Sequence, residues 1–138
     1  MSQEKIKHLE FIQDIITRMN KNSFQLKGWM ITIVSALLAL YGSSNNDIYI
    51  WIAIAPTVIF WLLDAYYLQQ ERKFRGVYND VAGLSSEDQK IEIRDFEMPI
   101  HRYVCGKYCY FNVLKSTTIA MIYVPVILGL VFAGILIK

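Results

Sequence analysis

Asp64 is the most chemically informative side chain in the sequence, because it carries the only charge in the apolar segment Ile48–Leu68. A carboxylate in such a segment is costly unless it is paired or hydrated. Lys27 precedes a second apolar block, Gly28–Gly42, and the short connection 43–47 makes the two blocks antiparallel neighbours. We therefore predict that Lys27 and Asp64 form an ion pair that locks these two segments together.

Two other roles for Asp64 are also compatible with the sequence. The carboxylate could conduct ions or sense protons, or it could simply extend toward a polar interface. Arg72 lies two helical turns further along the same face and is too far away to pair directly without water. The choice between a structural and a functional acid therefore depends on whether Lys27 reaches Asp64.

Other polar or small residues inside the apolar blocks are few. Thr32 and Ser35 could line a pore, or they could bond to carbonyl groups of their own helix. Gly129 and Ala133 are spaced four residues apart, which suits close contact between helices. These four positions are the candidates for pore lining or helix contact.

Enzyme signatures are missing from the sequence. It has no phosphate-binding glycine loop, no histidine-rich metal motif and no Ser-His-Asp arrangement. His101, Cys105 and Cys109 recur at steps of four and would share one face of a helix, but a fourth zinc ligand is lacking and the spacing is unusual for structural zinc. We therefore expect no catalytic residue, no metal and no cofactor.

The apolar residues gather in three blocks. A bilayer core about 30 Å thick needs about 20 helical residues. Residues 48–69 and 117–137 meet this length, whereas 28–42 is short and its helix can start near Ser23. The sequence thus predicts an all-α membrane protein with three transmembrane helices, an N-terminal amphipathic helix and a cytoplasmic region between the second and third spans.

Composition agrees with a lipid bilayer as the main partner. Hydrophobic residues make up 54% of the chain, above the roughly 45–50% of soluble domains. The net charge of +2 is too small to indicate a nucleic acid as partner.

The basic residues predict the orientation of the chain. Thirteen of the 14 precede the first span or lie between the second and third, and only Lys138 falls on the other side. Because basic residues concentrate on the cytoplasmic side, the N-terminus is predicted to be cytoplasmic and the C-terminus external. Residues 43–47 then form a short external loop.

Residues 1–27 have the spacing of an amphipathic helix, with an apolar face made of Ile6, Leu9, Ile12, Ile16 and Met19. This face could pack on another cytoplasmic helix, pair across subunits or lie on lipid. Its polar face mixes acids and bases, which favours packing over a lipid surface. We also expect the face to be too large to stay exposed, which favours self-association.

The region 70–116 is predicted to be cytoplasmic and partly helical. The second span continues without proline as far as Gly83, a natural stop signal. Ile91–Arg94 alternates like a short strand, and 101–116 has the pattern of a helix that leads into the third span.

Two stretches resemble a known family: Asn22–Trp29, and Phe60–Leu68 with Glu71, Arg72, Phe74, Arg75 and Tyr78 after it. Together they resemble the RipA-like family of small octameric proteins of the bacterial inner membrane, with a more distant likeness to SLATT-type membrane effector domains. The resemblance covers the chain from its start to the neighbourhood of Asp80, and beyond that point only the layout agrees. It implies a homo-oligomer, an octamer in that family, and it implies no enzyme activity.

Two functions are compatible with these features. The first is a homo-oligomeric inner-membrane protein that forms a pore or remodels the membrane. The alternative is a non-conducting scaffold or anchor that organises other proteins. A phage-type holin, which commonly ends in a charged tail, fits the sequence less well.

Overall fold

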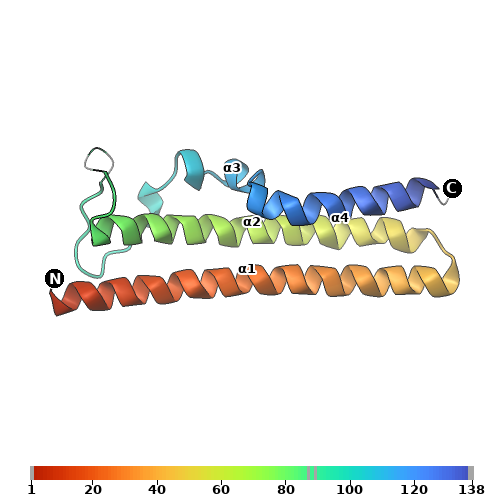
Figure 1. The fold of residues 1–138 in the computed structure, drawn as a ribbon, viewed down its shortest axis with the longest axis horizontal. Helices are drawn as coiled ribbons and strands as arrows, with labels where there is room; N and C mark the ends of the chain where they lie inside the picture. Colours follow the sequence, from red (N-terminus) through yellow and green to blue (C-terminus); the bar gives the residue numbers. More distant parts are fainter. Residues whose placement is uncertain (1, 87, 89, 137–138) are drawn as a thin grey trace.

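The computed structural model describes residues 2–86, 88 and 90–136, and it is built around two long antiparallel helices (Figure 1). Helix α1 spans Gln3–Ser44 and α2 spans Ile48–Ala82. At 1.5 Å per residue these helices are about 63 Å and about 52 Å long. They pack side by side and form a hairpin closed by the short connection 45–47.

A third long helix covers only half of the hairpin. Helix α4, Thr117–Leu136, runs along α2 toward the end where α1 and α2 are joined (Figure 1). The short helices η1 (Ile100–Arg102), η2 (Gly106–Tyr108) and α3 (Tyr110–Leu114) lie over the other half of α2.

The predicted amphipathic helix and first span are one uninterrupted helix. Ser2 caps its start by accepting a hydrogen bond from the Lys5 N–H (3.3 Å), and Asn45 ends it in the left-handed conformation (φ 50°). No proline or break in the helix separates the segment that ends at Lys27 from the block 28–42, so the boundary between them is one of composition alone.

The apolar face of the first half of α1 is largely covered by the same chain, although Ile6 at its start is 44% exposed. Ile12 and Ile16 lie in a buried cluster with Val77, Val81 and Tyr103. This confirms that the face packs on another helix, namely the C-terminal part of α2. Because most of this face is covered within one chain, its size no longer argues for self-association.

Helix α2 ends where the sequence predicts, at Gly83. Gly83 adopts φ 75°, and its N–H donates to the carbonyls of Asn79 and Asp80. A residue with a side chain would be strained in this conformation.

Two predictions for the region between α2 and α4 were wrong. Residues 91–94 form no strand in the described structure, because no neighbouring segment pairs with their backbone. The single helix predicted for 101–116 is broken into η1, η2 and α3. Gly106 takes a left-handed φ of 65°, and Cys105 and Cys109 are extended, so the helical hydrogen bonds cannot continue.

Gly76 of α2 has a specific packing role. The rings of Tyr103 and Tyr108 meet edge to face (5.3 Å between centroids) above it. A Cβ atom at Gly76 would lie 2.7 Å from the Tyr108 hydroxyl and 2.8 Å from the Tyr103 ring. The Tyr103 hydroxyl donates to Asp80, and burial, followed by the Asp80 carboxylate, raises the pKa of Tyr103 well above its usual range. The phenol therefore stays protonated and holds the segment between α2 and α4 against α2.

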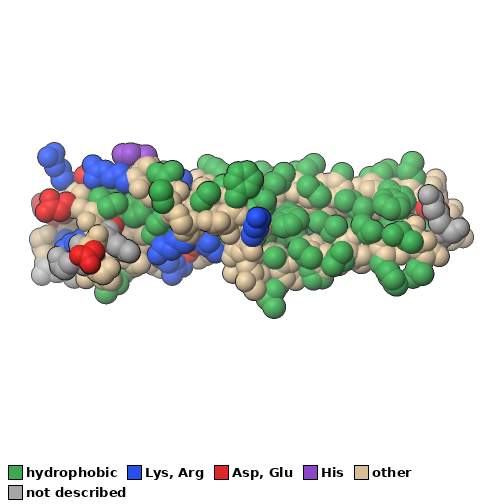
Figure 2. Space-filling view, turned by 90° about the horizontal axis from the view of Figure 1, so that it is seen from above, with side chains coloured by type: hydrophobic (Ala, Val, Ile, Leu, Met, Phe, Trp, Pro, Cys, Tyr) green, Lys and Arg blue, Asp and Glu red, His purple; other side chains and the backbone are tan. Residues whose placement is uncertain are grey.

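The molecule has one charged half and one apolar half. In the described part of the chain, α1, α2 and α4 are each long and apolar enough to cross a membrane. Figure 2 shows Lys, Arg, Asp and Glu side chains gathered on one half of the elongated shape, while hydrophobic side chains cover the half that contains α4. We call these the charged half and the apolar half.

Candidate functional site

The ion pair follows from the geometry of the hairpin. Lys27 lies about five helical turns before Asn45, and Asp64 lies about five turns after Asp47. In antiparallel helices of equal rise, positions equally far from the connection lie at the same level. Ser23 is one turn before Lys27 on α1 and therefore shares its face.

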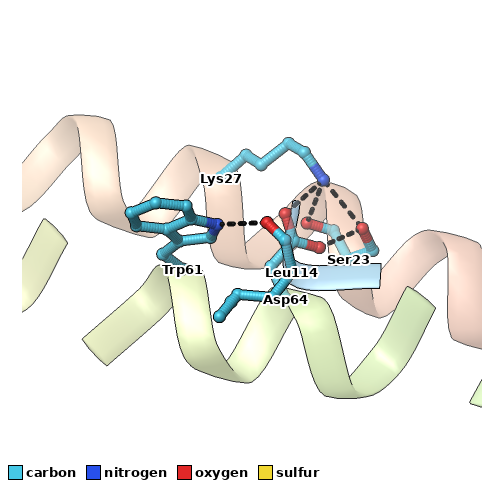
Figure 3. A network of polar contacts seen from close by, with 5 residues as sticks. All are labelled: Ser23, Lys27, Trp61, Asp64 and Leu114. Atoms are coloured by element: carbon cyan, nitrogen blue, oxygen red, sulfur yellow. Dashed lines mark hydrogen bonds and ion pairs between the residues drawn. The ribbon is translucent and has the colours of Figure 1, made fainter. Parts of the chain in front are cut away.

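The structure brings Lys27, Ser23 and Asp64 together (Figure 3). Lys27 Nζ lies 2.6 Å from Asp64 Oδ2 and donates to Ser23 Oγ at 2.8 Å. The Ser23 hydroxyl in turn donates to Asp64 Oδ1. The Asp64 side chain is 0% exposed and that of Lys27 is 17% exposed. Each carboxylate oxygen thus has a partner from α1, although Oδ2 is held by the ion pair without a hydrogen bond of good geometry.

Helices α3 and α4 both pack on α2 next to the site. The Trp61 ring stacks on Tyr123 (6.3 Å between centroids, 6° between planes), and Trp61 Nε1 donates to the Leu114 carbonyl at 3.3 Å (Figure 3). The buried Tyr123 hydroxyl is near enough to Asp64 to interact with it, but no hydrogen bond of good geometry reaches that hydroxyl. The contacts near Asp64 therefore connect all three long helices, α1 to α2 through the ion pair and α2 to α4 through the stacked rings.

This level lies within the apolar half. Tyr123 is the seventh residue of α4, which places it about 9 Å beyond the start of that helix. A buried charge at such a position is tolerated when its partner and hydrogen bonds are in place. The arrangement therefore favours a structural role for Asp64, the locking of α1 to α2, over a freely titrating acid.

The other candidate positions do not join this site. Thr32 Oγ1 donates to the Gly28 carbonyl of its own helix at 2.9 Å. Ser35, Gly129 and Ala133 line an apolar groove of about 330 Å³ between α1 and α4.

Gly129 is not a close contact inside the chain. A Cβ atom there would meet nothing within 4 Å, whereas one at Gly134 would lie 2.9 Å from the Trp51 ring. The tight approach of α4 to α2 thus occurs at Gly134. Whether Gly129 and Ala133 contact another chain stays a prediction.

A row of small residues runs along the outward face of α1 in the apolar half. Its members recur at steps of three and four and are all exposed: Gly28, Thr32, Ser35, Ala39 and Gly42. They lie opposite the buried residues Leu26, Met30 and Val34. Small residues let two helix backbones approach closely in a bilayer. We call this row the α1 small face.

The histidine and cysteine pattern does not form a metal site. Because residues 101–116 are not one helix, His101, Cys105 and Cys109 do not share a helix face. Within the described residues, no three His, Cys, Asp or Glu side chains gather closely enough to hold a metal ion.

Sequence reasoning missed three members of the site. Ser23 was identifiable from its position one turn before Lys27, since a hydroxyl there can complete the shell of a buried carboxylate. Trp61 and Tyr123 carry no such signal, because their meeting depends on how α4 packs on α2.

No family model, curated protein or solved structure matches the chain. The resemblance to the RipA-like family therefore stays an expectation from the quoted residues.

Proposed function

We propose that the protein is a homo-oligomeric integral protein of the bacterial inner membrane that forms a pore or remodels the bilayer. The α1 small face is the observation that carries this proposal. It is exposed, lies in the half that would be in lipid, and combines close-approach residues with the Thr32 and Ser35 hydroxyls. A helix that faces only lipid gains nothing from a row of small residues. A helix that packs on a second copy of itself gains close backbone contact from it.

In this proposal α1, α2 and α4 span the bilayer and the charged half lies in the cytoplasm. The basic residues support this orientation, since 13 of the 14 belong to the segments assigned to the cytoplasmic side. The long uninterrupted hairpin would couple changes in the cytoplasm to the contacts between spans.

A non-conducting scaffold is the second candidate. The ion pair favours it, because Asp64 is fully buried and held by α1, which leaves that acid unavailable for conduction within one chain. Any conducting path would then have to run between chains, along the α1 small face.

Mass measurement in mild detergent tests the proposal. We expect a closed assembly of more than two chains. Ala39→Leu, which lies on the α1 small face and outside the groove between α1 and α4, should lower the assembled fraction several-fold, because a larger side chain keeps the helices apart. Leu40→Trp, an exposed change on another face of α1, is the matched control and should assemble normally. A monomeric wild-type protein would contradict the proposal. If the wild type and both variants assemble equally, the α1 small face is not the contact between chains.

A further inference from the structure

Three basic residues lie on segments that meet near the boundary between the charged half and the apolar half: Arg72, Lys107 and Lys115. The Lys107 ammonium lies over the Tyr108 ring, 5.1 Å from its centroid, and no acid among the described residues pairs with it. The Arg72 guanidinium donates to the Ser116 hydroxyl at 2.7 Å and to the Lys107 carbonyl at 3.2 Å. Residues 107 and 115–116 are therefore held against the same point of α2. Lys107 and Lys115 are exposed, and Thr117 begins α4 directly after this point.

This cluster has no acidic counterpart. The sequence contains no Asp or Glu after Glu97. Glu71, the acid next to Arg72 in the chain, is occupied by Arg75, and Asp64 is occupied by Lys27. In the described part of the chain, no carboxylate forms an ion pair with Arg72, Lys107 or Lys115.

The level of the cluster corresponds to the headgroup layer. Arg72 lies just over two turns beyond Asp64, or about 12 Å toward the charged half. If α4 spans the bilayer, its first residue, Thr117, lies near the boundary between hydrocarbon and headgroups. Cations without counter-ions at this boundary attract phosphate groups of anionic lipids.

We propose that Arg72, Lys107 and Lys115 form a binding site for the phosphodiester group of an anionic phospholipid. This inference rests on the proposed membrane location and adds a specific partner to it. The bound lipid would hold the α2–α4 junction by its headgroup, while its acyl chains lie along the apolar half. Free phosphate has the same chemistry but lacks the acyl chains, so the two sources can be separated.

Native mass spectrometry of the detergent-extracted protein tests the site. The probes are dioleoyl phosphatidylglycerol and dioleoyl phosphatidylcholine, with inorganic phosphate as competitor. We expect the wild type to prefer phosphatidylglycerol. Lys107→Gln combined with Lys115→Gln should weaken this binding by about 30-fold, given the usual contribution of each cation near a membrane surface. The double variant keeps the anchor of Arg72, because Arg72 binds the carbonyl of Lys107 and not its side chain.

The matched control is Lys7→Gln combined with Lys90→Gln, which removes the same charge from exposed sites near the far end of the charged half. It should bind phosphatidylglycerol within about twofold of the wild type, because screening limits distant charges. Each of three results would overturn the proposal. Both double variants could lose phosphatidylglycerol binding equally, the wild type could show no preference between the two lipids, or millimolar phosphate could displace the bound lipid. Retention in alkali-washed membranes is measured separately. A retained wild type without lipid preference refutes the lipid site alone, whereas an unretained wild type refutes the membrane location and the site with it.

Discussion

Replacing either Lys27 or Asp64 by alanine is expected to destabilise the folded protein by about 3–5 kcal/mol, because each change leaves a buried charge without its partner. The double variant should lose clearly less than the sum of the two single losses, since no unpaired charge remains. Thermal unfolding in detergent, followed by the amount of folded protein that survives heating, measures all three variants. The 2.6 Å separation and complete burial of Asp64 make this the largest coupling expected in the chain.

The exposed pair of Glu97 and Arg102 supplies the matched control. Its charged groups are 3.9 Å apart, and both side chains are more than a third exposed. A pair of this kind contributes about 0–1 kcal/mol, so its double-mutant cycle should show little coupling. If the losses at Lys27 and Asp64 are instead additive, the lock between α1 and α2 is refuted. A protein that keeps its stability but loses conductance on Asp64→Asn would indicate that Asp64 conducts ions.

Gly76→Ala is expected to destabilise the protein by about 1–3 kcal/mol, the usual cost of overpacking. In most helices this substitution is favourable by about 1 kcal/mol. Here the new methyl group would collide with Tyr103 and Tyr108, at 2.8 Å and 2.7 Å. Tyr103 cannot easily move aside, because its ring is buried and its hydroxyl is bound to Asp80. Chemical or thermal unfolding of the purified variant measures the effect.

Two further variants separate collision from a general effect of removing a glycine. Gly129→Ala should be neutral or stabilising, since its Cβ atom meets nothing within 4 Å. Adding Tyr108→Phe to Gly76→Ala removes the hydroxyl but leaves the Tyr103 ring, so only part of the stability should return. Full stability of Gly76→Ala alone would contradict the packing described for this segment.

The long helices were predictable from sequence because their signals are local. Apolar length defined the helix Thr117–Leu136 closely, and Gly83 marked the end of α2. The antiparallel hairpin followed from the short connection, and with it the level of Lys27 and Asp64. These inferences need only helical rise and residue type, which do not depend on distant contacts.

The segment between α2 and α4 was not predictable in the same way. Residues 100–114 follow the surface of α2, where Gly76 provides space for Tyr103 and Gln69 donates to the Tyr108 carbonyl at 2.9 Å. Such contacts override the helical pattern of the sequence, and so does the left-handed Gly106. The burial of His8, whose Nδ1 accepts from the Phe96 N–H at 3.3 Å, depends on the same fold of this segment.

We propose that the α1–α2 hairpin crosses the membrane with the charged half in the cytoplasm. Labelling of single cysteines by a membrane-impermeant maleimide tests it most directly. Cys105 and Cys109 are first replaced by serine, and one cysteine is introduced by Ser44→Cys or by Ser86→Cys. Both positions are exposed and lie at opposite ends of α2. In intact spheroplasts we predict labelling of the Ser44→Cys protein alone, with labelling of the Ser86→Cys protein only after lysis. The reverse pattern would contradict the orientation, and equal labelling of both in intact spheroplasts would contradict a hairpin that spans the bilayer.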